Sequence, residues 1–149
     1  MAILEFLTAE HRGCDENFAI AEEAAQAGDL ARCQHEFQRF QRVTELHFKK
    51  EEQELFPVFE QVSGNTLGPT RVMRLEHQQV RETLAEMNSA LDHGDLAEFL
   101  GQAETLLILM QQHNIKEEQM LYPMCDRVLG ATAGSVIEAM RAVSDRPPA

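Results

Sequence analysis

The sequence predicts an all-α protein: an up-and-down antiparallel four-helix bundle with an internal two-fold repeat and a short C-terminal fifth helix. The first observation is that HFKKEEQELFP, residues 47–57, is echoed by HNIKEEQMLYP, residues 113–123. The second is that glycine and proline gather near residues 28, 64 to 69, 94 and 130. Between these breaks, apolar residues recur at helical spacing among Ala, Leu, Glu, Gln and Arg. A chain of 149 residues is the length of one ordinary domain.

The offset between the two stretches, 113 − 47 = 66 residues, also relates other parts of the chain. Glu10 and His11 return as Glu76 and His77, and the GDLA stretch at residues 28–31 returns at 94–97. We therefore interpret the chain as a duplicated helical hairpin. The predicted domain covers residues 1–130, with repeat halves at about 3–62 and 69–128, and residues 131–149 form a short helix and a disordered tail.

Each predicted helix has recognisable ends. The expected helices cover about residues 3–27, 29–61, 70–93 and 95–128, and a fifth lies around 135–143. In both hairpins a glycine closes the first helix and the following aspartate, Asp29 or Asp95, caps the next. Such short connections make neighbouring helices antiparallel. Pro69 suits the start of a helix, whereas Pro57 and Pro123 should kink or end theirs.

Composition narrows the class of protein. Three cysteines with no CxxC pair fit reduced thiols in a cytoplasmic protein better than a disulfide scaffold. The N-terminal stretch MAILEFLTAEH does not resemble a signal peptide, and no apolar run is long enough to span a bilayer. The net charge of −12 disfavours nucleic acid and anionic membranes as partners, because both require a basic surface.

Four histidines belong to the repeat, one on each helix, and each lies on the apolar stripe of its helix. They are His11, His47, His77 and His113. In the second helix of each half a glutamate, Glu51 or Glu117, follows the histidine at i+4 on the same face, about 6 Å along the axis. A lone histidine on such a face is usually a core residue. Four in matched pairs, with two carboxylates that are costly to bury without a partner, predict a cation at the bundle centre.

The donor set restricts the metal. Imidazole and carboxylate without thiolate suit iron, zinc or manganese, and two carboxylates able to bridge suit a pair of ions. A ferritin-like carboxylate site is the rival, but it needs Glu-x-x-His with i, i+3 spacing. This chain places the histidine first and the glutamate at i+4.

The EH pairs at residues 10–11 and 76–77, together with HxxxEE followed by LFP or LYP, resemble the hemerythrin-like (HHE cation-binding) domain family. The resemblance extends to about residue 130. It implies a non-heme, carboxylate-bridged diiron site with two iron ions. Carried onto this sequence, the implied ligands are His11, His47, Glu51, His77, His113 and Glu117, and no catalytic residue is assigned.

The sequence departs from the oxygen-carrying members of that family at Arg81, where they have a second histidine. The remaining set of four histidines and two glutamates is similar to that of bacterial proteins that repair iron-sulfur clusters, but the cysteine-bearing N-terminal extension of those proteins is missing here. Arg81 has two interpretations: an ion pair with Asp15, its repeat equivalent, or a side chain that extends to solvent. Asp15 is also an alternative seventh ligand.

Further candidates have structural interpretations beside functional ones. Glu10 and Glu76 are expected as solvated caps or salt-bridge partners, and Glu52 as solvated. Glu54 either orients a histidine and guides cations or is exposed beyond the kink. The remaining expectations are a buried, apolar Cys14, a packing role for Tyr122 opposite His113, and surface positions for His35 and His93.

The resemblance and the donor set indicate a cytoplasmic protein that binds or senses a small diatomic ligand, oxygen or nitric oxide, or handles iron. The alternative is a diiron enzyme that acts on peroxide or donates iron in iron-sulfur cluster repair. A third class, an interaction module with a purely structural metal, would need a large exposed apolar surface that this acidic sequence does not suggest.

Overall fold

The computed structural model describes residues 2–144, which are almost entirely helical and contain no strand. The first hairpin consists of α1 (Ala2–Gln26) and α2 (Leu30–Lys50), and the second of α4 (Pro69–Asp92) and α5 (Leu96–Lys116). Each hairpin continues through a π-helical segment, Glu51–Leu55 or Glu117–Leu121, into α3 (Phe56–Ser63) or α6 (Tyr122–Leu129). A 3-10 turn, Gly130–Thr132, leads to α7 (Ala133–Arg141).

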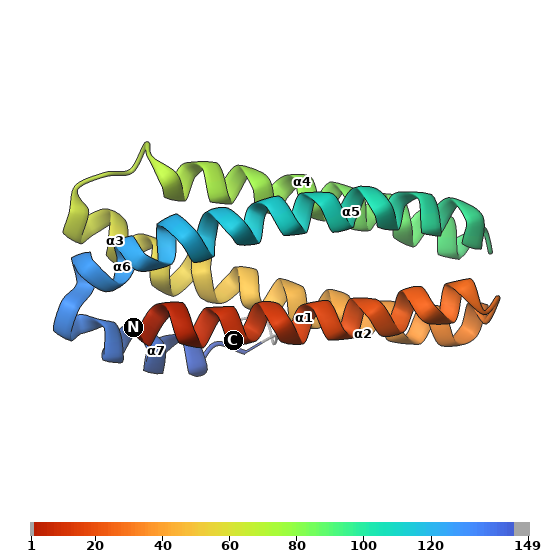
Figure 1. The fold of residues 1–149 in the computed structure, drawn as a ribbon, viewed down its shortest axis with the longest axis horizontal. Coiled ribbons are helices and arrows are strands. Elements are labelled where there is room, and N and C mark those ends of the chain that lie inside the picture. The colour runs from red at the N-terminus through yellow and green to blue at the C-terminus, as the bar shows by residue number, and fades with distance from the viewer. Residues whose placement is uncertain (1, 145–149) are drawn as a thin grey trace.

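The two hairpins lie along each other and form an elongated bundle (Figure 1). Both short turns, between α1 and α2 and between α4 and α5, lie at one end, while α3, α6 and α7 gather at the other. The predicted four-helix bundle and short fifth helix are confirmed. Residues 145–149, predicted as part of a disordered tail, lie outside the described residues. Within residues 2–144 no helix has the length and apolar character needed to cross a membrane.

The turns between paired helices use the residues that the sequence indicates. Gly28 and Gly94 adopt left-handed backbone angles, with φ of 75° and 68°. The side chains of Asp29 and Asp95 then each accept a hydrogen bond from the backbone N–H three residues later, at 3.1 and 3.0 Å. Glycine tolerates positive φ, and aspartate satisfies an N–H that the first helical turn leaves free. These tight turns hold the paired helices antiparallel.

The helices do not end at their late prolines. Pro57 is the second residue of α3, and the N–H of Phe56 before it donates to the carbonyl of Glu51, five residues back. Proline lacks an N–H and crowds the carbonyl four residues earlier, and the wider π turn accommodates both effects. The second copy repeats the arrangement at Pro123. The predicted kink or end is therefore a π turn that begins at the i+4 glutamate, and the chain continues as a helix.

Buried apolar side chains form two clusters, one toward the hairpin turns and one toward α3, α6 and α7. The first includes Phe18, Phe37, Phe40, Leu84, Met87, Phe99 and Leu106. The second includes Ile3, Leu7, Leu55, Phe59, Met73, Leu121, Ile137 and Met140. The four repeat histidines lie along the helices between these clusters and form a polar layer in the bundle interior.

The segments after the π turns are tied to the opposite half. Asp126 in α6 accepts hydrogen bonds from the backbone N–H groups of Ile3 and Leu4, at 2.9 and 3.1 Å. Its repeat equivalent, Glu60 in α3, accepts one from the Thr70 hydroxyl at 2.7 Å. Each half therefore fixes the start of the helix that opens the other half, which sets the register of the histidines.

Candidate metal centre

The six residues that the sequence predicts as metal ligands are all buried at one level of the bundle, with side chains that are at most 4 % exposed. They are His11, His47, Glu51, His77, His113 and Glu117. Their side-chain donor atoms form two overlapping groups, and within each group these atoms lie within 4.8 Å of one another. One group is Glu51, His77, His113 and Glu117; the other is His11, His47 and Glu117.

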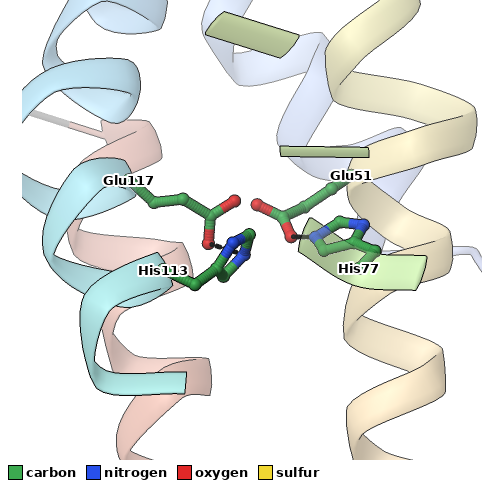
Figure 2. A group of neighbouring side chains, drawn as sticks. All are labelled: Glu51, His77, His113 and Glu117. Carbon is green, nitrogen blue, oxygen red and sulfur yellow. Dashed lines mark ion pairs between the residues drawn. The ribbon is translucent and has the colours of Figure 1, made fainter. Parts of the chain in front are cut away.

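Each central glutamate connects the two halves. Glu117 Oε1 lies 3.0 Å from His11 Nε2, in the first half, and 3.1 Å from His113 Nε2 on its own helix. Glu51 Oε1 likewise lies 3.2 Å from His77 Nε2, in the second half, and 3.3 Å from His47 Nε2, four residues earlier in its own half. Figure 2 shows the carboxylates of Glu51 and Glu117 pointing toward each other, each with a histidine beside it. Neither half has a complete set of inward donors alone.

A second ring of carboxylates holds the outer edge of each imidazole. The Nδ1 atoms bond to these partners: His11 to Glu118 at 2.7 Å, His47 to Glu10 at 2.9 Å, His77 to Glu52 at 2.6 Å and His113 to Glu76 at 2.9 Å. An ionised carboxylate can only accept, so each Nδ1 carries the proton and donates it. In the neutral imidazole the lone pair is then on Nε2, which faces the centre. Histidines that ligate a metal almost always donate their other ring N–H in this way, to a carboxylate, a backbone carbonyl or a water.

Several inward atoms are buried without a hydrogen-bond partner. They are Nε2 of His47, His77 and His113, Oε1 of Glu51 and Oε2 of Glu117. Some lie within ion-pair distance of one another, but without hydrogen-bond geometry. Unsatisfied polar atoms are costly in a protein interior, and these five belong to one cluster of lone-pair donors. The residues therefore fit a bound cation, which would satisfy all of them.

Without a metal, these groups shift one another's proton affinity. Burial alone lowers the pKa of His113, but the nearby charge of Glu117 and the hydrogen bond to Glu76 raise it to about 10. The pKa of His47 is raised in the same way, chiefly by Glu51. Burial favours the neutral form of Glu51, yet the neighbouring histidines hold its pKa well below the usual range. The metal-free centre therefore favours imidazolium–carboxylate pairs, and a cation would replace those protons.

The sequence profile of the hemerythrin HHE cation-binding domain matches residues 2–125 of the chain. The chain belongs to this family. The match begins with α1 and ends within α6, so it contains both hairpins and every residue of the inner and outer rings of this hemerythrin-like domain. Neither a curated protein nor a solved structure matches the chain.

Tyr122 lies in the hemerythrin-like centre, where the sequence did not place it. Its hydroxyl donates to a carboxylate, with 2.7 Å to Glu51 Oε2 and 2.9 Å to Glu117 Oε1, and the side chain is fully buried. Nine residues separate it from His113, which is half a turn away on a regular α-helix. The π turn inserts an extra residue and rotates the side chains after it by about 100°. The ring packs in the second apolar cluster as predicted, but its placement opposite His113 was wrong because it assumed uninterrupted α-helical spacing.

The carboxylates of the outer ring have larger roles than predicted. Glu10 and Glu76 are salt-bridge partners, as expected, since each binds a lysine, Lys50 or Lys116. They also hold histidine Nδ1 atoms, which helical projection of a single helix cannot show. Glu52 is only partly exposed rather than solvated as expected, because it holds the His77 ring from the neighbouring hairpin.

Arg81 follows neither of its two predicted interpretations. Its guanidinium binds Glu52, at 3.0 and 3.1 Å, and Glu45, at 2.8 and 3.0 Å, and does not pair with Asp15. It thus supports the carboxylate that holds His77. Asp15 is exposed and belongs to neither group of potential ligands, so the seventh-ligand alternative has no support from the geometry.

The remaining expectations concern positions around the centre. Cys14 is buried, and His35 and His93 are exposed, as predicted. Glu54 is partly buried rather than exposed, and it lines a surface hollow with Lys49 and Ala139 of α7. It belongs to neither group of potential ligands. A separate cavity of about 130 Å³ reaches His47 from the surface between α1 and α2.

Proposed function

We propose that this hemerythrin-like chain is a non-heme diiron protein that binds or senses a small diatomic ligand, oxygen or nitric oxide. The ligands would be the four histidines and two glutamates of the inner ring. The observation that carries the proposal is the cluster of buried inward donor atoms without hydrogen bonds. Two overlapping donor groups that share Glu117 support a pair of ions rather than one.

The number of donors favours open coordination positions. Six side chains, even with both carboxylates bridging, cannot complete two octahedral spheres. Iron, when bound, supplies the affinity for oxygen or nitric oxide at such positions, as the family membership suggests. The chain's own part is to hold the imidazoles through the outer carboxylates and to keep the centre dry.

The surroundings favour a small ligand over a large substrate. Phe48 stacks on His77, with 3.9 Å between ring centroids, and apolar clusters cover the polar layer on both sides. The cavity beside His47 is the size of a few solvent molecules, and Gly13, Cys14 and Val43 contribute to its lining. A diatomic molecule can use such a cavity, and a bulky metabolite cannot.

The test is to purify the protein anaerobically, count metals per chain and record absorption spectra on addition of oxygen or nitric oxide. Two irons per chain and a new near-ultraviolet band after oxygen would support the proposal, whereas one tightly bound zinc or no metal would contradict it. His77→Ala should lose metal, and His35→Ala, a histidine exposed on α2, should keep it. Rapid turnover of added peroxide by the iron-loaded protein would favour the enzymatic alternative over sensing.

A further inference from the structure

The hydroxyl of Tyr122 contacts three of the proposed ligands at once. Its oxygen lies 2.7 Å from Glu51 Oε2, 2.9 Å from Glu117 Oε1 and 3.1 Å from His11 Nε2. Donor atoms that share an edge of an octahedron with bonds of about 2.0 to 2.1 Å are about 2.9 Å apart. The phenol oxygen therefore has the spacing of a further ligand atom.

Packing does not account for this hydroxyl, as the repeat shows. The equivalent of Tyr122 in the first half is Phe56, which is also fully buried and also directly follows a π turn. The Phe56 ring lies 5.9 Å from the His77 ring, and the Tyr122 ring lies 5.6 Å from the His11 ring, which is the repeat equivalent of His77. The two rings fill equivalent spaces, and one of them carries a polar oxygen into the centre. Burying that oxygen is unfavourable unless it has a partner there.

We propose that Tyr122 is a seventh protein ligand, a phenolate bound to the iron that His11 also binds. This inference rests on the proposed iron site. On binding of iron(III) the phenol O–H bond breaks, the oxygen keeps the electron pair and bonds to iron, and the proton leaves to solvent; no oxidant or reductant is needed. Phenolate is a hard anionic donor that iron accepts in other proteins. Because Phe56 cannot do the same, the two irons become inequivalent.

The sequence makes this inference directly measurable, because Tyr122 is the only tyrosine and the chain has no tryptophan. Protein loaded with iron(III) should show a visible phenolate-to-iron charge-transfer band, and resonance Raman excitation within that band should enhance tyrosinate ring vibrations. Tyr122→Phe should bind the same number of irons and lose the band and the vibrations completely. Phe56→Leu, the matched change in the other half, should keep both.

The outcomes separate this inference from the proposed function. Two irons per chain in the natural protein without tyrosinate vibrations would overturn the phenolate ligand and leave the iron site intact. Absence of bound iron would overturn both. The spectrum of the natural protein decides the question even where Tyr122→Phe fails to fold.

Discussion

The two halves of the bundle share one construction but differ in what surrounds it. In each half the first helix supplies a histidine, the second supplies a histidine and a glutamate, and a π turn begins at that glutamate. The outer carboxylates are duplicated as well, Glu10 with Glu76 and Glu52 with Glu118. The donor set is therefore symmetric in position, and each half completes the other.

The differences are at three pairs of positions close to the centre. Tyr122 faces the cluster where the first half has Phe56, Arg81 supports an outer carboxylate where the first half has Asp15, and Gly13 borders a cavity where the second half has a glutamine. Duplication thus builds the cluster of buried histidine and glutamate donors, while divergence around it makes its two sides chemically unequal. Variants of the duplicated residues test the symmetry, and variants of the three unequal pairs test its exceptions.

The largest effect is expected at the two central glutamates. Glu51→Ala and Glu117→Ala should each lose most of the bound metal, and to the same extent, because each carboxylate joins one histidine from either half. Metal content measured by elemental analysis after identical loading checks this. Glu54→Ala, a partly buried glutamate away from the centre, is the control and should retain its metal. Full metal retention in one of these variants would show that the glutamate replaced in it is not a ligand.

The metal-free protein should lose stability as the pH rises. A histidine whose pKa is higher in the folded than in the unfolded state stabilises the fold fully below about pH 6.5 and loses this contribution as the pH passes the folded value. For His113 the folded value is about 10, and the pKa of His47 shifts in the same direction. The Tm of chelator-treated protein should therefore fall by roughly 5 °C or more between pH 6.5 and 10.

The metal-loaded protein provides the comparison for that measurement. Coordination requires neutral imidazoles, so protons compete with metal and the metal-dependent gain in Tm should shrink toward acid pH. The difference in Tm between the two forms should therefore widen as the pH rises. A Tm of the metal-free form that does not change from pH 6.5 to 10 would contradict the imidazolium–carboxylate pairing.

The sequence predicts the bundle well because its signals are local and repeated. Helix ends at Gly28 and Gly94, caps at Asp29 and Asp95, and a 66-residue repeat are enough to derive four antiparallel helices. The same spacing brings the six inner-ring residues to one level, because His and Glu at i, i+4 share a helix face. Their role as ligands remains a prediction that metal analysis must test.

The contacts around the centre could not be predicted in the same way. Tyr122 was misplaced because no local signal beyond the proline at 123 indicates a π turn, and one inserted residue changes which face every later side chain occupies. Glu52 and Arg81 contact each other between helices, so their partnership depends on the relative rotation of the two hairpins. The repeat contains one usable hint, since an aromatic residue precedes both prolines.

A moderate effect on ligand entry is expected from filling the cavity beside His47. A Cβ added at Gly13 meets no atom within 4 Å, so leucine can extend into this space. Gly13→Leu should slow association of nitric oxide with the reduced iron protein several-fold in stopped-flow measurements, with metal content unchanged. Gly101→Leu is the matched control, because Gly101 is an exposed helical glycine with equally open surroundings. The change gains the same helix propensity, about 0.5 to 1 kcal/mol, and should leave the association rate unchanged. Equal rates in both variants would exclude this cavity as the entry route.

The smallest effect is expected at the pair Arg81 and Asp15. Arg81→Ala removes four hydrogen bonds from Glu45 and Glu52, so the carboxylate that holds His77 loses its cationic support. Loss of a carboxylate that holds a ligand histidine typically lowers metal affinity about 10- to 100-fold. Arg81 acts one step further out, through Glu52, so Arg81→Ala should lower the affinity by less, about two- to fivefold. Asp15 is exposed and no hydrogen bond joins it to the outer ring, so Asp15→Ala should change affinity less than twofold. Competition with a chromophoric chelator measures both. Equal losses of metal affinity in the two variants would contradict this prediction. They would mean that charge near the centre matters more than the contacts that Arg81 makes.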